Sequence, residues 1–88
     1  AGIRIACAKR PVSAAAIDRM VGEVENTLVS LGKPEVSSRI VGDIVMAALK
    51  EFDYVAYIRY AIVYLGLDDL QSIRDEIDTL LESEVNPG

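Results

Sequence analysis

The stretch that decides the fold is DYVAYIRYAIVYLGL, residues 53–67. Between its first and last tyrosine the only charged residue is Arg59, so a helix formed here is apolar nearly all round. Such a helix must be buried nearly all round, and it is too short to cross a bilayer, which takes about 20 apolar residues. We therefore predict the central helix of a small domain, capped by Asp53 and ended by Gly66.

Length and charge limit what the rest of the chain can be. Eighty-eight residues make one domain. The net charge is −5 and the acids are concentrated after residue 67, which argues against DNA binding by a basic face of this segment. The apolar fraction of 51% is high for this size. It favours a surface that another chain, or a missing part of this one, covers.

The rare residue types exclude several kinds of chemistry. With Cys7 as the only cysteine and no histidine, the sequence holds no internal disulfide, no cysteine-rich zinc site and no histidine base. Cys7 itself is typical of a small core residue. No signal peptide or membrane span is visible, so we expect a cytoplasmic protein. The start at Ala1-Gly2, in mid-pattern, indicates truncation.

Helical periodicity accounts for the remaining segments, and none alternates with the period of a strand. The prediction is an all-α bundle of four full helices plus the end of a fifth, in a single domain over residues 1–88 with a flexible tail at about 83–88. The predicted segments are the last turns of a helix over 1–9, a helix over 14–31 capped by Ser13 and closed by Gly32, one over 39–51 capped by Ser37 or Ser38, the central helix, and a final helix that starts at Asp68-Asp69.

Three tyrosines of the central helix are the first functional candidates. Tyr57, Tyr60 and Tyr64 share one face at helical spacing, so the rings of Tyr57 and Tyr64 can stack along it. In a core, each ring is hidden and its hydroxyl reaches a polar partner. In a site, the same face forms a wall for a flat ligand such as a purine. The pattern leaves both readings open.

Charged and hydroxyl residues offer weaker candidates. Arg59 either pairs with an acid, which we expect, or contacts a phosphate. Lys9-Arg10 is expected to be a solvated basic spot. Ser37 and Ser38 are expected to act as caps, although a helix N-terminus can also bind phosphate. No phosphate-binding glycine loop and no nucleophile with an adjacent base is present, so we predict no catalytic residues and no enzyme.

Several short segments of the sequence resemble a known family. AGIRIACAKRPVS, the turn EVSS, VGDIVMAALKEFD and DYVAYIRYAIVY are similar to the ATP-cone of the bacterial ribonucleotide-reductase repressor, over residues 1–81. That family joins an N-terminal zinc ribbon to an ATP-cone. The ribbon and the basic strand–turn that opens the cone are absent here, so the resemblance implies a truncated cone.

The resemblance also implies a function. In the family, the cone binds ATP or dATP as effector, the nucleotide sets the state of a homo-oligomer, and that state decides whether the zinc ribbons grip DNA. Zinc and DNA would then belong to the missing module only, and no membrane is involved. Two alternatives remain: the allosteric ATP-cone of a reductase itself, or a helical interaction module without a ligand.

Site residues carry over position by position. Ser37 matches a small hydroxyl residue at a helix start that faces the nucleotide, and Val41 lies one turn on. Tyr64 matches a residue near the base and sugar, with Tyr57 and Tyr60 behind it. The resemblance thus implies a nucleotide site at these five residues. The chain departs from the family near that end of the helix, at Ile62, Leu65 and Leu67.

Overall fold

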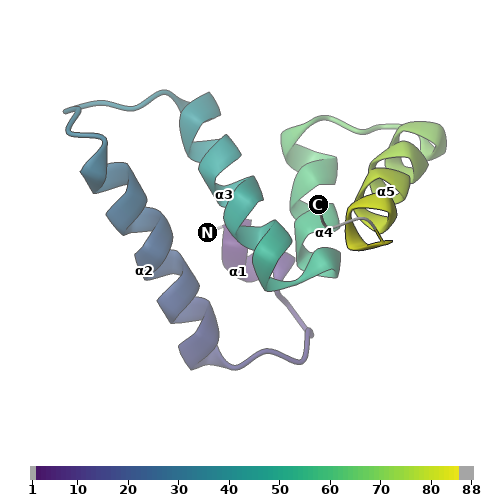
Figure 1. The fold of residues 1–88 in the computed structure, drawn as a ribbon, viewed down its shortest axis with the longest axis horizontal. Helices are drawn as coiled ribbons and strands as arrows, with labels where there is room; N and C mark the ends of the chain where they lie inside the picture. The colour runs from purple at the N-terminus through teal and green to yellow at the C-terminus, as the bar shows by residue number, and fades with distance from the viewer. Residues whose placement is uncertain (1, 86–88) are drawn as a thin grey trace.

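The computed structural model describes residues 2–85, and within them the chain forms five helices (Figure 1). All secondary structure in this range is helical, which confirms the prediction of an all-α fold; four of the helices are longer and α1 is short. The helices are α1 (Gly2–Ala6), α2 (Ala14–Ser30), α3 (Ser38–Phe52), α4 (Tyr54–Tyr64) and α5 (Leu70–Val85).

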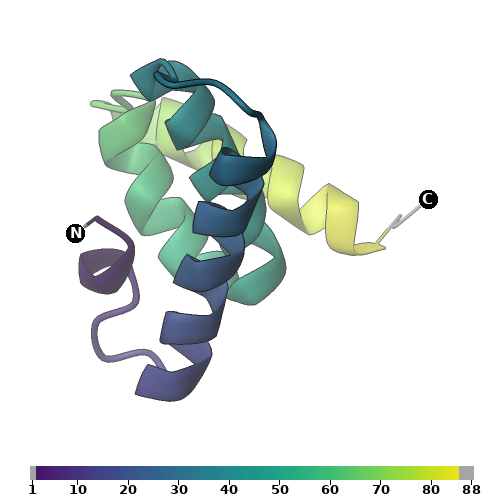
Figure 2. The same ribbon diagram turned by 90° about the vertical axis from the view of Figure 1, so that its left-hand side faces the viewer.

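Helix α4 lies between its neighbours, as the prediction of a central helix requires. It packs against α3, α1 and α5, whereas α2 packs against α3. Helices α2 and α3 form an antiparallel pair in Figure 1. Figure 2, turned by 90°, shows α1 at one edge of the molecule and the far end of α5 at the opposite edge.

Hydroxyl caps start two of the helices. The Oγ atom of Ser13 accepts a hydrogen bond from the backbone N–H of Ala16 at 3.0 Å. Ser37 Oγ accepts from the N–H of Ile40 at 3.2 Å, so Ser37 rather than Ser38 caps α3. Each bond satisfies an N–H that the first helical turn leaves without a partner.

A single residue, Asp53, joins α3 to α4. Its backbone is extended, with φ −163° and ψ 120°, and its N–H donates to the carbonyl of Leu49 at 2.9 Å. Its carboxylate accepts from the N–H of Ala56 at 2.9 Å, which confirms the predicted cap. Because one residue ends one helix and begins the next, the two helices have little freedom to change their crossing.

Small side chains line the contacts of α4 with its neighbours. Ala56, Ala61 and Leu49 are fully buried, and short alanines let helix backbones approach. Cys7 is buried as well, as predicted for a core residue. The buried core consists of Ala6, Cys7, Met20, Val24, Val45, Leu49, Ala56, Tyr57, Ala61 and Leu80.

The expectation that α4 is buried nearly all round is wrong. Val63 is 83% exposed and Val55 41%, and Arg59 is exposed on the same side. At 100° per residue these three side chains lie on one face of the helix. Three neighbouring helices pack against α4 on its other sides, so within residues 2–85 this face is the least covered one.

Glycines end two helices, as predicted. Gly32 and Gly66 have φ values of 66° and 67°, in the left-handed region that side chains disfavour. The first helix is shorter than expected. It ends at Ala6, and Lys9 turns the chain at φ 60°.

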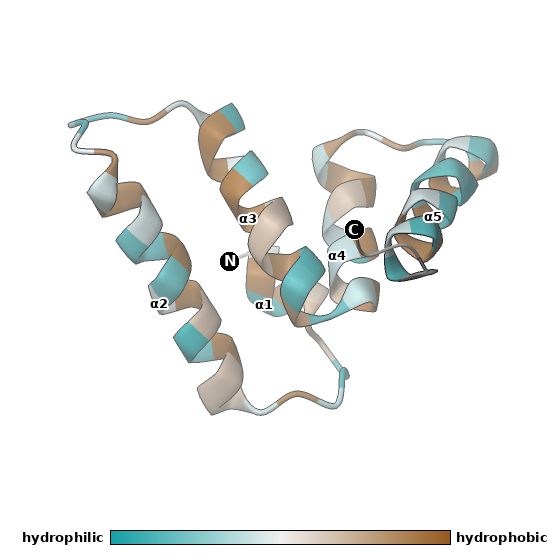
Figure 3. Cartoon of the chain, viewed as in Figure 1, coloured by the Kyte–Doolittle hydropathy of each residue, from teal (hydrophilic) through white to brown (hydrophobic). Residues whose placement is uncertain are grey.

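The final helix begins at Leu70, two residues later than its predicted start. Asp69 precedes it as a capping residue, since its carbonyl accepts from the N–H of Ile73 and its carboxylate accepts from the hydroxyl of Ser72. In Figure 3 the outer side of the α5 ribbon is coloured mostly as hydrophilic residues. The flexible tail expected at about 83–88 stays a prediction, because α5 runs to residue 85 and residues 86–88 lie outside the described range. None of the described helices has the length and apolarity to cross a membrane.

Candidate functional site

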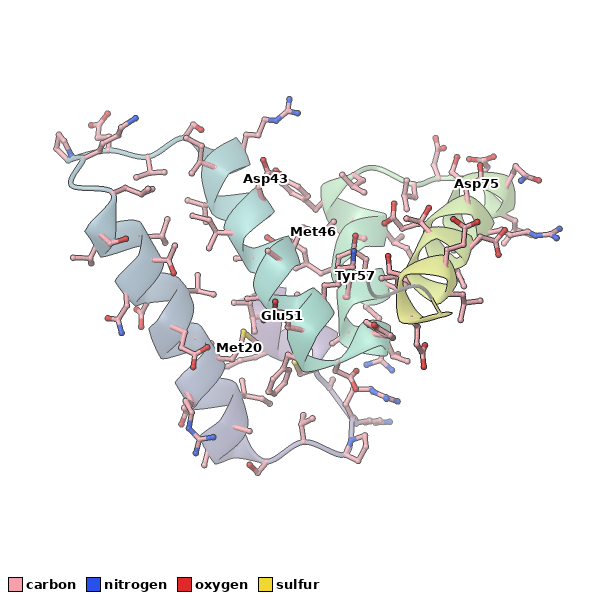
Figure 4. All side chains as sticks on the ribbon, viewed as in Figure 1. Met20, Asp43, Met46, Glu51, Tyr57 and Asp75 are labelled. Atoms are coloured by element: carbon pink, nitrogen blue, oxygen red, sulfur yellow. The ribbon has the colours of Figure 1, made fainter. Side chains whose placement is uncertain are left out.

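The structure divides the three tyrosines of α4 into a stacked pair and a single residue. The rings of Tyr60 and Tyr64 stack with centroids 5.8 Å apart and planes inclined by 29°. Tyr57 is buried, and its hydroxyl donates to Oε2 of Glu76 at 2.8 Å. Figure 4 shows Tyr57 on α4 beside α5. Tyr64 therefore stacks on Tyr60 and not on Tyr57.

The surroundings of Tyr57 are those of a structural residue. Burial raises the pKa of Tyr57 to about 12, and the hydrogen bond to Glu76 adds to that shift. The phenol is therefore a neutral donor near neutral pH, and it ties α5 to α4. This geometry fits the core reading that the pattern had left open.

Tyr64 closes against the start of α3. Its hydroxyl lies 2.9 Å from the carbonyl oxygen of Arg39 and 3.1 Å from Oδ1 of Asp43. Burial, and then the contact with Asp43, raises the pKa of Tyr64. Its ring lies against Gly42, where a Cβ atom would come within 2.1 Å of the ring. Gly42 is therefore required for the present position of Tyr64.

Tyr60 is the member of the stacked pair that lies next to α1. A Cβ atom on Gly2 would lie 3.2 Å from Cε2 of Tyr60, so the start of α1 lies over this ring. Tyr60 is half-buried and packs against the core. The stacked pair thus joins α1 to α3 across α4.

Arg59 holds the other end of α1, by a contact that sequence analysis did not expect. Its Nη1 atom donates to the carbonyl oxygens of Ala6 at 3.2 Å and of Ala8 at 2.6 Å. These are carbonyls that the end of a helix leaves without intrahelical partners. The expected salt bridge of Arg59 is wrong, because the carbonyls take the place of an acid.

Arg10 is likewise paired rather than solvated, which corrects the expectation for Lys9-Arg10. Its Nε and Nη2 atoms donate to the two carboxylate oxygens of Asp53 at 2.8 and 3.0 Å. The Arg10 guanidinium holds the pKa of Asp53 below its usual value, and the hydrogen bond from the Ala56 N–H lowers it further. Arg10, in the turn after α1, and Arg59, on α4, thus hold the end of α1 against α4.

The other two predicted site residues lie on the first turns of α3. Ser37 is exposed, and its hydroxyl is used as the cap. Val41 is half-buried and packs against the hydrophobic core. The structure places them on the same helix start that Tyr64 contacts. Whether they touch a nucleotide stays a prediction.

A groove of about 390 Å³ opens between the start of α3 and the end of α4. In this groove the predicted Tyr64 meets Arg39 and Asp43, which were not among the residues predicted from the sequence. Figure 4 shows Asp43 on the side of α3 that faces α4. The groove is lined by Ser38, Arg39, Asp43, Tyr64 and Leu65.

The chemistry of this groove suits a nucleotide. The guanidinium of Arg39 can contact phosphate, and the positive end of the α3 dipole favours the same charge. The carboxylate of Asp43 can accept from a sugar hydroxyl or a base amine, and Tyr64 offers a ring. Arg39 and Asp43 are four apart on one helix, so they share a face. That spacing is the signal by which they could have been found.

The remaining candidates show no reactive environment. Burial raises the pKa of the Cys7 thiol, which favours the inert protonated form. Among the side chains described for residues 2–85, no three His, Cys, Asp or Glu residues are grouped to hold a metal ion.

Comparison with known proteins agrees with the resemblance found in the sequence. A family model described as the ATP cone domain matches residues 1–70. The match includes α1 to α4 and both sides of the groove. It ends where α5 begins.

Two similar curated proteins carry the same name. The chain is 46% identical over 83 residues to "Transcriptional repressor NrdR" of Chloroflexus aurantiacus, covering 94% of this chain and 50% of that protein. It is 51% identical over 79 residues to the protein of the same name from Thermomicrobium roseum, covering 90% and 49%. The chain therefore spans about half the length of the curated relatives it matches. These findings confirm the resemblance to the repressor.

Proposed function

The chain belongs to the ATP-cone family, and from this premise we propose that it is the nucleotide-sensing part of a transcriptional repressor. The genes it controls are those of ribonucleotide reductase. ATP and dATP are its effectors, and the bound nucleotide sets the oligomeric state of the protein. That state decides whether a zinc ribbon, outside this chain, can hold DNA.

The observation that carries the proposal is the extent of the likeness to repressors. The match of 83 residues leaves at most five residues of the chain unmatched, so it takes in most of α5, which lies beyond the family model. The second candidate is an ATP-cone from a reductase. It would also match the family model, but it would not explain the similarity to repressors in α5. The similar proteins from Chloroflexus and Thermomicrobium are named as repressors.

The groove between α3 and α4 supports nucleotide binding at a defined place. Arg39 and the α3 N-terminus would take the phosphates, Asp43 a hydroxyl or amine, and Tyr64 the base or sugar. Ser37 and Val41 lie on the same helix start. Tyr60 lies behind Tyr64 as its stacked neighbour. In this arrangement Tyr57 supports the site only through α4.

Charge supports the assignment of DNA binding to another module. A chain of net charge −5 repels phosphate backbones, whereas DNA-binding surfaces are basic. The zinc of the ribbon would also lie outside this chain. We place the protein in the bacterial cytoplasm, where a repressor meets DNA.

Nucleotide control needs no catalysis. A ligand shifts an equilibrium between two assemblies only by binding one of them more tightly. The shift is reciprocal, because assembly must then change nucleotide affinity by the same factor. The fastening of α1 to α4 and of α4 to α3 gives a physical route by which a nucleotide in the groove could act on both helices.

Calorimetric titration of the intact protein that contains this chain tests the proposal. We expect saturable heat with ATP and with dATP, and a thermal midpoint that rises with nucleotide concentration, because a ligand that binds only the folded state stabilises it. The Arg39→Ala variant should lose most of this response. No heat and no thermal shift would leave the third candidate, a helical interaction module without a ligand.

A further inference from the structure

An apolar groove lies between α4 and α5, separate from the groove between α3 and α4. Its volume is about 230 Å³. Several of its walls are open to solvent, since Leu81 is 53% exposed, Val55 41% and Ile77 38%. Its lining is Tyr54, Val55, Ile58, Ile77, Leu80 and Leu81.

The α5 side of this groove is strongly acidic. From Leu70 to Val85 the sequence holds five acidic residues and only one basic residue, Arg74. That arginine lies 3.8 Å from the carboxylate of Asp78, next to it on the helix surface. An occupant of this groove should therefore offer an apolar side chain with basic residues beside it.

The chain carries a segment with that chemistry at α1. Ile5 is 74% exposed, although it is a large apolar residue. Arg4 and Lys9 lie close to it in the sequence and are exposed as well. The first acidic residue of the chain is Asp18, whose carboxylate pairs with Arg4 at 2.6 Å. This short segment presents an isoleucine between two basic residues, of which Arg4 is paired with Asp18.

One molecule cannot bring these two surfaces together. The start of α1 lies over Tyr60 on one face of α4, whereas Ile58 lines the groove from another face. At 100° per residue these two side chains point about 160° apart. A contact between α1 and this groove would therefore join two molecules.

We propose that the α4–α5 groove is an interface that receives Ile5 and the basic segment around it from a second copy of this chain. The apolar side chain fills the groove and the basic residues meet the acidic side of α5. Charge complementarity selects this occupant over a second α5, which would bring like charges together. The proposal gives a surface to the oligomerisation in the proposed function. It does not depend on nucleotide binding.

Complementation between two variants tests the interface. Ile5→Glu replaces the apolar side chain with a negative charge in the basic segment, whereas Leu81→Lys replaces an apolar wall of the groove with a positive charge. Both positions are more than half exposed, so folding should persist, and circular dichroism checks it. Sedimentation without nucleotide should show association of the unmodified chain at high micromolar concentration. Each variant alone should be monomeric.

The mixture of the two variants is the decisive sample. Ile5→Glu keeps an intact groove and Leu81→Lys keeps an intact Ile5, so an equimolar mixture should associate although neither component does. Val29→Glu is the matched control, because Val29 is 78% exposed on α2, far from both surfaces, and this change should leave association unaltered. A monomeric unmodified chain, a monomeric mixture or a dissociated control would each overturn the interface. Calorimetry with nucleotide would still test the proposed function separately.

Discussion

The carboxylate of Asp53 accepts two hydrogen bonds from Arg10, 43 residues earlier in the chain, while it also caps α4. One residue therefore serves three elements: its backbone N–H ends α3, and its carboxylate caps α4 and holds the turn that follows α1. Arg59 makes a second link to that turn through the carbonyls of Ala6 and Ala8. The position of α1 depends on these contacts, because α1 has only five residues.

The first prediction concerns the pH dependence of this link. The pKa of Asp53 is lower in the folded chain than its ordinary value of 3.8, so its contribution to stability is present above that value. It is lost as the pH falls through the lower, folded value. We expect the difference in unfolding free energy between the unmodified chain and Asp53→Asn to be constant near neutral pH and to shrink below about pH 4.

Asparagine is a suitable replacement because it still caps a helix but cannot pair with Arg10 as an ion. Urea unfolding at a series of pH values measures the difference. A difference that stays the same down to pH 2 would mean that the ionised carboxylate contributes nothing to the fold.

The second prediction concerns Arg59. Arg59→Met keeps most of the apolar stem but removes the donor, so the carbonyls of Ala6 and Ala8 lose their partner. We expect a loss of about 1 kcal/mol in unfolding free energy. Hydrogen exchange should quicken in α1 more than in α2. Equal changes in the two helices would argue that Arg59 acts on the whole fold and not on α1.

The third prediction compares two glycines in helices. Alanine favours a helix over glycine by up to about 1 kcal/mol. At Gly22, where no neighbour lies within 4 Å of a Cβ atom, Gly22→Ala should stabilise the chain. At Gly42 the new Cβ would overlap the Tyr64 ring, so Gly42→Ala should destabilise it by about 1–3 kcal/mol.

A truncated ring provides the control for that comparison. In a Tyr64→Leu background the overlap at position 42 is relieved, so Gly42→Ala should cost much less there. Thermal unfolding of the four chains measures this coupling. Additive effects of the two changes would contradict a close contact between Gly42 and Tyr64.

Local signals in the sequence predicted the helices and their caps because those features depend on neighbours in the chain. Ser13, Ser37 and Asp53 were identified from the residues beside them, and Gly32 and Gly66 from their position after apolar runs. The partners of Arg10 and Arg59 were not predictable in the same way. Arg10 and Asp53 are 43 residues apart, and Arg59 and Ala8 are 51 apart. A periodic pattern cannot predict contacts between residues so distant in the sequence.

The candidate site shows the same limit. Helical spacing placed three tyrosines on one face but could not tell which neighbour each ring would meet. Helix α5 lies near Tyr57 and α3 lies near Tyr64. The two tyrosines, although chemically identical, therefore bind different partners. The spacing of Arg39 and Asp43 shows that they share a face of α3, but only the fold shows that this face lies opposite the end of α4.

The last prediction separates the two hydroxyls. Tyr57→Phe and Tyr64→Phe make the same chemical change, and each removes a hydrogen bond from α4 to a neighbouring helix. Both should therefore lower the thermal midpoint without unfolding the chain. Only Tyr64 lines the groove between α3 and α4, so only Tyr64→Phe should weaken dATP binding by the intact protein, by a few-fold. The measurements are thermal unfolding without ligand and the dATP dissociation constant. If dATP affinity falls equally in both variants, the loss follows from stability. If it falls in neither, the Tyr64 hydroxyl serves the core alone, since the contact with Asp43 then holds two helices together and no ligand depends on it.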